Sequence, residues 1–127
     1  MKKIAFIIFI IFSTLSCSFR SDYSASFDIS NKSQYELSEV KLYVEVGKVL
    51  LDSIDLNTVQ SGASISTVLF QNELPNSDGG FYLRFKQNNN IVGHEFDYFT
   101  NGILLAERYE ITITDDEVTV NTTVRSF

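Results

Sequence analysis

The sequence contains one cysteine, one histidine, one proline and no tryptophan. With Cys17 alone, the chain cannot form an internal disulfide, and a zinc site, which needs three or four convergent ligands, lacks its usual donors. His94 alone would have to serve any Ser-His-Asp arrangement, and the stretch Gly62-Ala63-Ser64-Ile65-Ser66 departs from the G-x-S-x-G pattern at its last position. We therefore expect no enzymatic activity, no bound metal and no cofactor.

Positive charge is also scarce. The chain carries 10 Lys and Arg residues against 16 Asp and Glu residues, which gives a formal net charge of −6. An acidic surface repels phosphate backbones, so we expect no nucleic-acid partner.

The longest apolar run lies near the amino-terminus. Lys2 and Lys3 precede an apolar run from Ile4 to Phe12, and small polar residues lead from there to Cys17. As a helix this run spans only about 14 Å of a hydrocarbon core of about 30 Å, and the pattern is typical of a secretory signal peptide. We predict that residues 1–16 are removed, which leaves 127 − 16 = 111 residues and, with two lysines lost, a net charge of −8.

The segment Leu15-Ser16-Cys17 resembles the lipobox of bacterial lipoproteins, with its leucine two residues before the cysteine where three is usual. The resemblance implies cleavage between Ser16 and Cys17 and lipid modification of Cys17. It also implies a cell-envelope location, which we expect to be the outer membrane, with the periplasmic or surface face left open. The alternative is an ordinary secretory signal that leaves Cys17 as a free thiol. If Cys17 is instead lipidated, two or more acyl chains on this one residue anchor the protein stably.

After Cys17, residues 17–24 are polar enough to form a short tether, and residues 25–127 have the length of one domain. In this domain the apolar residues alternate with polar ones. Val40, Leu42 and Val44 alternate with Lys41 and Tyr43, which is typical of a half-buried strand. The same pattern and the intervening turn residues predict strands at approximately 24–30, 38–46, 48–54, 63–70, 80–87, 91–98, 107–114 and 117–124.

The last two strands can be aligned by parity. With Asp115-Asp116 as the turn, Ile113 faces Val118 and Ile111 faces Val120, so apolar residues meet apolar residues. A slip of one residue would oppose inward and outward rows, so this register is strongly specified.

Seven or eight short antiparallel strands predict an all-β, immunoglobulin-like β-sandwich, although the usual buried tryptophan and paired cysteines are absent. An eight-stranded up-and-down barrel is the alternative. The Asn31-Lys32-Ser33 turn, the Val40–Val46 strand and the Ser61-Gly62-Ala63-Ser64 turn resemble Ig-like modules of bacterial envelope proteins. Tyr98-Phe99-Thr100-Asn101-Gly102, with a closing hairpin that contains Val-Thr-Val, resembles small uncharacterised Bacteroidota lipoproteins, a resemblance that implies no activity.

One stretch, from Phe96 to Leu105, is more apolar than a turn requires. Strict alternation places Phe96 and Tyr98 on one face of their strand and Phe99 on the other. If the stretch is exposed, Phe96, Tyr98, Phe99 and Asn101 are candidate residues for binding a partner. The alternative is that Ile103 to Leu105 fold back and cap one end of the sandwich.

Two classes of function remain. The first is a lipid-anchored, non-catalytic module that binds a protein or glycan of the envelope. The second is a carrier of a small ligand, or an envelope enzyme, with a site near His94. An enclosed pocket or a cleft joining His94 to two carboxylates favours the second class, and a filled core favours the first.

If Cys17 carries the lipid, Cys17→Ala releases the protein from membranes or leaves it as an uncleaved precursor, because the modified residue is also the cleavage site. Mass spectrometry of the mature amino-terminus is the decisive measurement. A native product that begins at an unmodified Cys17, or upstream of it, contradicts the lipoprotein interpretation.

Overall fold

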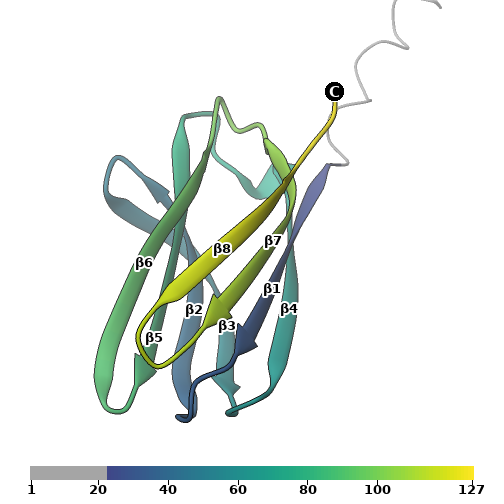
Figure 1. Ribbon diagram of the computed structural model, residues 1–127. Coiled ribbons are helices and arrows are strands. Elements are labelled where there is room, and N and C mark those ends of the chain that lie inside the picture. The colour runs from purple at the N-terminus through teal and green to yellow at the C-terminus, as the bar shows by residue number, and fades with distance from the viewer. Residues whose placement is uncertain (1–22) are drawn as a thin grey trace, which may run out of the picture.

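The computed structural model describes residues 23–127, which form eight strands and one short 3-10 helix (Figure 1). The predicted signal peptide, its cleavage site and Cys17 lie outside the described residues. The elements in chain order are β1 (Ser24–Asn31), β2 (Leu37–Val46), β3 (Val49–Val59), β4 (Ser64–Phe70), η1 (Gln71–Glu73), β5 (Gly79–Gln87), β6 (Asn90–Phe99), β7 (Ala106–Ile113) and β8 (Val118–Val124).

The strands form two four-stranded sheets that pack face to face as a β-sandwich (Figure 1). The first sheet has the order β4-β1-β7-β8, and the second has the order β3-β2-β5-β6. Each sheet ends in two unpaired edges, so the alternative of a closed up-and-down barrel is wrong. The all-β sandwich predicted from the alternating sequence is confirmed.

One strand pair departs from the expected antiparallel arrangement. β1 and β7 run parallel, with Phe27 opposite Tyr109 and Ile29 opposite Ile111. Parallel neighbours need a long crossover connection, and here the chain between them passes through the whole second sheet. The two strands are central in their sheet, and the facing pairs are apolar and buried.

The β7–β8 hairpin has the register that parity predicted. Ile113 lies opposite Val118, Ile111 lies opposite Val120, and the Thr114 amide donates to the Glu117 carbonyl at 3.0 Å. The Thr114 hydroxyl also accepts from the Glu117 amide at 3.2 Å. These contacts close the turn at Asp115-Asp116.

β3 is longer than its prediction of 48–54, because it continues through Asn57 to Val59. The sequence suggested a turn at Asn57, and this residue does have a positive φ of 60°. However, it belongs to a β-bulge: Lys41 pairs with Asp55 and Val40 with Asn57, so the strand gains one residue and continues. The Asp55 carboxylate accepts from the Asn57 amide at 2.9 Å and holds the bulge.

A cluster of aromatic rings joins the two sheets. Phe27 of the first sheet stacks on Tyr109 at 4.8 Å between ring centroids and meets Phe81 of the second sheet edge-on at 5.1 Å. Phe96 meets both Phe27 and Tyr109, at 6.2 and 5.6 Å. Because aromatic side chains bury the largest apolar areas, these four rings fill the centre of the core.

A buried polar contact fixes the corner between β1 and β2. The Asn31 side-chain amide donates to the Tyr35 carbonyl at 2.8 Å and to the Val59 carbonyl at 3.0 Å. Its oxygen accepts from the Ser33 amide at 3.0 Å and the Ser33 hydroxyl at 2.7 Å. Every donor and acceptor of this buried side chain is therefore used, which is the condition for burying it without a penalty.

The inward row of β2 is buried as expected, with Leu42 only 3% exposed. We expect Leu42→Ala to lower the free energy of unfolding by about 2–5 kcal/mol, because it leaves a cavity in a packed core. Lys41→Ala, on the outer face of the same strand, should change it by less than about 0.5 kcal/mol. Denaturant melts of the two variants measure the difference, and equal effects contradict the assignment of the faces.

Candidate functional site

The candidate residues at the end of β6 are arranged by a second β-bulge. Gly80 pairs with Tyr98 and Phe81 pairs with Phe96, so Asp97 is the additional residue, and it has a positive φ of 48°. Its carboxylate accepts from the amide of Tyr98 at 2.8 Å. On the partner strand Gly80 is required, since a Cβ there would lie 2.8 Å from the Asp97 carbonyl oxygen.

The bulge inverts the alternation that the sequence predicted. Phe96 is 8% exposed and Phe99 is 0% exposed, so both point into the core, whereas Tyr98 is 62% exposed. The prediction that Phe96 and Tyr98 share a face, with Phe99 opposite, was wrong because one extra residue shifts the parity. Of the four candidate partner-binding residues, Tyr98 and Asn101 are at the surface, and Phe96 and Phe99 are part of the core.

The loop after β6 is hydrogen-bonded to the segment that leads into β5. The Asn101 amide donates to the Asp78 carboxylate at 2.9 Å, and the Gly102 amide donates to the Ser77 carbonyl at 3.0 Å. Gly102 has a φ of 70° and lies so close to Pro75 that a Cβ would be 2.7 Å from its carbonyl oxygen. The next part of the loop places Leu104 in the core, where it is fully buried. Leu104 thus caps this end of the sandwich, whereas Ile103 and Leu105, which the alternative interpretation also placed in the cap, are half-buried beside an open cleft.

This is also the end at which the described chain begins, and we call it the entry end. The carbonyl of Tyr23 accepts from the Gln71 amide at 2.8 Å, and its ring lies 4.4 Å from the Arg125 guanidinium and 6.4 Å from the Phe127 ring. Between these groups and the loop after β6 is an open cleft of about 580 Å³. It is lined by Tyr23, Gln71, Thr100, Asn101, Ile103, Leu105 and Phe127.

The Tyr109 ring beneath the Asp97 bulge is a core element. Burial raises the pKa of the Tyr109 phenol far above its ordinary value, and the nearby Asp97 carboxylate adds to the shift. The Asp97 carboxylate acts on the hydroxyl through a close polar contact as well as through its charge, although this contact does not have good hydrogen-bond geometry. The phenol therefore stays neutral at any physiological pH.

His94 lies directly opposite Leu83, so its side chain is on the inward side of β6. It is half-buried, because β6 is an edge strand and solvent reaches the side of the sandwich there. It lines none of five clefts found in the described part of the chain. Residues 23–127 also contain no group of three or more His, Cys, Asp or Glu side chains placed to hold a metal.

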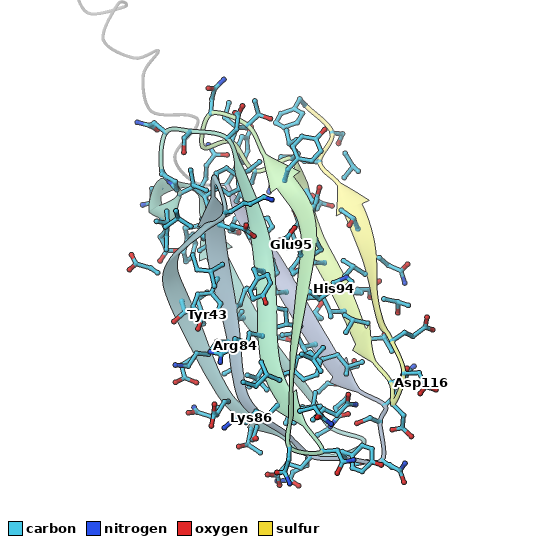
Figure 2. All side chains as sticks on the ribbon, turned by 90° about the vertical axis from the view of Figure 1, so that its left-hand side faces the viewer. Tyr43, Arg84, Lys86, His94, Glu95 and Asp116 are labelled. Atoms are coloured by element: carbon cyan, nitrogen blue, oxygen red, sulfur yellow. The ribbon has the colours of Figure 1, made fainter. Side chains whose placement is uncertain are left out.

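The outer face of the β3-β2-β5-β6 sheet brings together residues that the sequence showed only as separate outward rows. Tyr43 lies opposite Tyr82, with 6.3 Å between ring centroids, and Lys41 lies opposite Arg84. Tyr82 extends across Gly93 of the next strand, where any Cβ would overlap its hydroxyl. Figure 2 shows Tyr43, Arg84 and Lys86 following one another along this face.

The cations on this face are unequally paired. Lys86 Nζ lies 2.6 Å from Glu39 Oε1, and this hydrogen bond lowers the pKa of Glu39. Lys41 and Arg84 take part in no ion pair among the described residues, but their charges also lower the pKa of Glu39. The two cations lie directly opposite each other and repel. They line an open cleft of about 350 Å³ together with Ser38, Glu39, Asp55, Asn57 and Thr58.

The outer face of the other sheet differs, because its charges pair with one another. Ser66 Oγ donates to Asp28 Oδ1 at 2.6 Å, and Arg108 Nε donates to Asp28 Oδ2 at 2.8 Å. Arg108 also lies 3.2 Å from Glu110. The hydrogen bond from Ser66, followed by the contacts of Arg108, lowers the pKa of Asp28. The first of the two sheet faces, which we call the Tyr43 face (Lys41, Tyr43, Tyr82, Arg84 and Lys86), therefore presents two tyrosine rings beside two cations, Lys41 and Arg84, that form no ion pair among the described residues.

Comparison with known proteins supports the fold and adds no activity. No protein-family model and no curated protein matches the chain. Among solved structures it is similar to a protein from Eubacterium rectale determined by NMR, with a TM-score of 0.53, 13% identity, and coverage of 82% of this chain and 92% of that one. In residues 23–127 no helix is long and apolar enough to cross a bilayer.

The two neighbours Tyr98 and Phe99 offer a matched test of the Asp97 bulge. Phe99→Ala should lower the free energy of unfolding by about 3–5 kcal/mol, because the ring is fully buried. Tyr98→Ala should change it by less than about 0.5 kcal/mol, because this ring is exposed. Thermal or denaturant melts distinguish the two, and a larger effect at Tyr98 would show that the strand keeps simple alternation through residue 97.

Proposed function

We propose that the protein is a lipid-anchored component of the cell envelope that acts as a non-catalytic binding module for a protein or glycan partner. The lipobox-like segment ending at Cys17 supports the anchor, and the resemblance to Bacteroidota lipoproteins supports an outer-membrane location. A single sandwich with a core filled by aromatic rings supports a binding module, because such a scaffold presents its faces and loops rather than an interior site.

The observation that carries the proposal is the Tyr43 face. Tyr43 and Tyr82 offer rigid amphipathic rings of the kind that dominate protein interfaces and that also stack on sugar rings. Beside them, Lys41 and Arg84 are close together without a paired carboxylate, although the protein as a whole is acidic. An anionic group on the partner would relieve their mutual repulsion, so we infer a partner that carries carboxylates or other acidic groups on its contact surface.

Substitutions on the Tyr43 face should therefore weaken partner binding, and substitutions on the other sheet should not. Tyr43→Ala and Arg84→Ala should each weaken binding about tenfold, or about 1.4 kcal/mol, and leave the melting transition in place. Phe70→Ala is the control, since it removes an exposed aromatic ring from the other sheet. Affinity capture of the tagged lipoprotein from its own membranes identifies the partner, and titration with the purified partner gives the affinities.

Raising the salt concentration should weaken binding of the wild-type protein and have less effect on Arg84→Ala, because the charge contribution is already lost. Equal affinities for Tyr43→Ala and wild type, or an equal loss in Phe70→Ala, would remove the Tyr43 face from the proposal.

A further inference from the structure

The exposed apolar side chains of the sandwich are concentrated at one end. Nine large hydrophobic residues are substantially exposed in the described part of the chain, and eight of them lie toward the entry end, with Ile91 as the exception. The eight are Val49, Leu50, Leu51, Val68, Phe70, Tyr98, Val124 and Phe127.

Strand pairing places these residues together although they are far apart in sequence. Phe70 pairs with Ser24, the first residue of β1, and Val124 pairs with Ala106, the first residue of β7. Tyr98 pairs with Gly80 at the start of β5, and Glu45 beside the β2–β3 hairpin pairs with the same glycine. In Figure 1 the carboxyl-terminus and the start of β1 lie at this same upper end.

The opposite end of the sandwich has another composition. Its turns are formed by polar residues that are exposed to solvent, as at Lys32, Ser61, Asn88, Asn89 and Asp116. Ile91 is the one large exposed hydrophobic residue there, next to the Asn88-Asn89 turn. Polar turn residues are exposed at both ends, but the exposed large apolar side chains lie almost all at the entry end, and such a concentration is typical of a contact surface.

The length of chain before the fold decides what can cover the entry end. Tyr23 is fixed to this end through Gln71, Arg125 and Phe127. Cys17 precedes it by six residues, which reach at most about 20–22 Å when fully extended. A lipid on Cys17 therefore brings the apolar end, and not the polar end, next to the bilayer surface.

We propose that the entry end is a membrane-contact surface that rests in the interfacial layer of the bilayer, so that the sandwich stands with its polar turns directed away from the lipid. The inference rests on the lipid anchor of the proposed function. Phe70, Tyr98 and Phe127 are the aromatic contacts, and such side chains favour the boundary between acyl chains and head groups. The open cleft lined by Ile103 and Leu105 adds further apolar surface at the same end.

Charge indicates which lipids suit this surface. Its carboxylates include Glu73, which accepts from the Phe70 amide at 2.7 Å, and Asp78, which accepts from the Asn101 amide at 2.9 Å. These two carboxylates and Asp97, beside Tyr98, outnumber the cations of this end, Lys48 and Arg125, so anionic head groups are repelled. The surface therefore fits a zwitterionic bilayer, and its contact should weaken as the anionic fraction rises.

Since the chain has no tryptophan, a single introduced tryptophan reports only on its own position. Tyr98→Trp and Ile91→Trp form a matched pair, because the two residues are 62% and 58% exposed and lie near opposite ends of β6. The full lipidated protein is placed in phosphatidylcholine vesicles that contain brominated lipid, a quencher of tryptophan. Flotation and intact mass first establish that each variant is lipidated and vesicle-bound, and melting curves establish that it is folded.

We expect the emission of Tyr98→Trp to shift to the blue and to be quenched, while that of Ile91→Trp stays unquenched. Val124→Trp, at the entry end of the other sheet, should behave as Tyr98→Trp does, and replacing part of the lipid by phosphatidylglycerol should reduce both signals. Vesicle-bound protein in which the three reporters are equally quenched, or equally unquenched, overturns the membrane-contact surface and leaves the lipid anchor intact. A protein that carries no lipid and does not float overturns the anchor and this inference with it.

Discussion

The stack of Phe27 on Tyr109, with Phe81 and Phe96 packed against both, is the contact on which the two sheets depend. With one cysteine the chain cannot join its sheets by an internal disulfide, and this aromatic packing joins them instead. The stack lies within the parallel β1–β7 pair, where Phe27 and Tyr109 are directly opposite each other. Side chains that face this cluster are buried, and those on the outer face of either sheet remain for the surface.

The Asp97 bulge has an effect well beyond one strand. By adding a residue, it directs both Phe96 and Phe99 into the core and turns Tyr98 outward between them. The aromatic residues of this stretch thus have two roles: Phe96 and Phe99 pack in the core, and Tyr98 is exposed at the entry end. Lys41 and Tyr43, in contrast, lie where β2 pairs regularly with β5, so they alternate with core residues and can vary in charge without disturbing the packing.

Period-two alternation was sufficient to predict the strands, and parity was sufficient for the β7–β8 register, because one face of each strand is buried and a slip would expose it. Alternation could not predict the bulges at Asn57 and Asp97, which depend on what the neighbouring strand presents. Lys41 and Tyr43, and likewise Tyr82 and Arg84, were visible as outward rows. Their meeting could not be predicted, because it requires knowing that β2 and β5, some forty residues apart, are neighbours in one sheet.

The buried Asn31 carries a consequence for how the protein can be produced. Asn31-Lys32-Ser33 matches the acceptor sequence for N-glycosylation, which eukaryotic secretory pathways modify on the nascent chain. A sugar on the Asn31 amide nitrogen would remove one of the two N–H groups that donate to the Tyr35 and Val59 carbonyls, and it would have to fit where no solvent reaches. In a eukaryotic host, glycosylation of Asn31 would thus compete with folding at this corner. Asn121, in the similar Asn-Thr-Thr segment, is exposed and could carry a sugar without altering the sandwich.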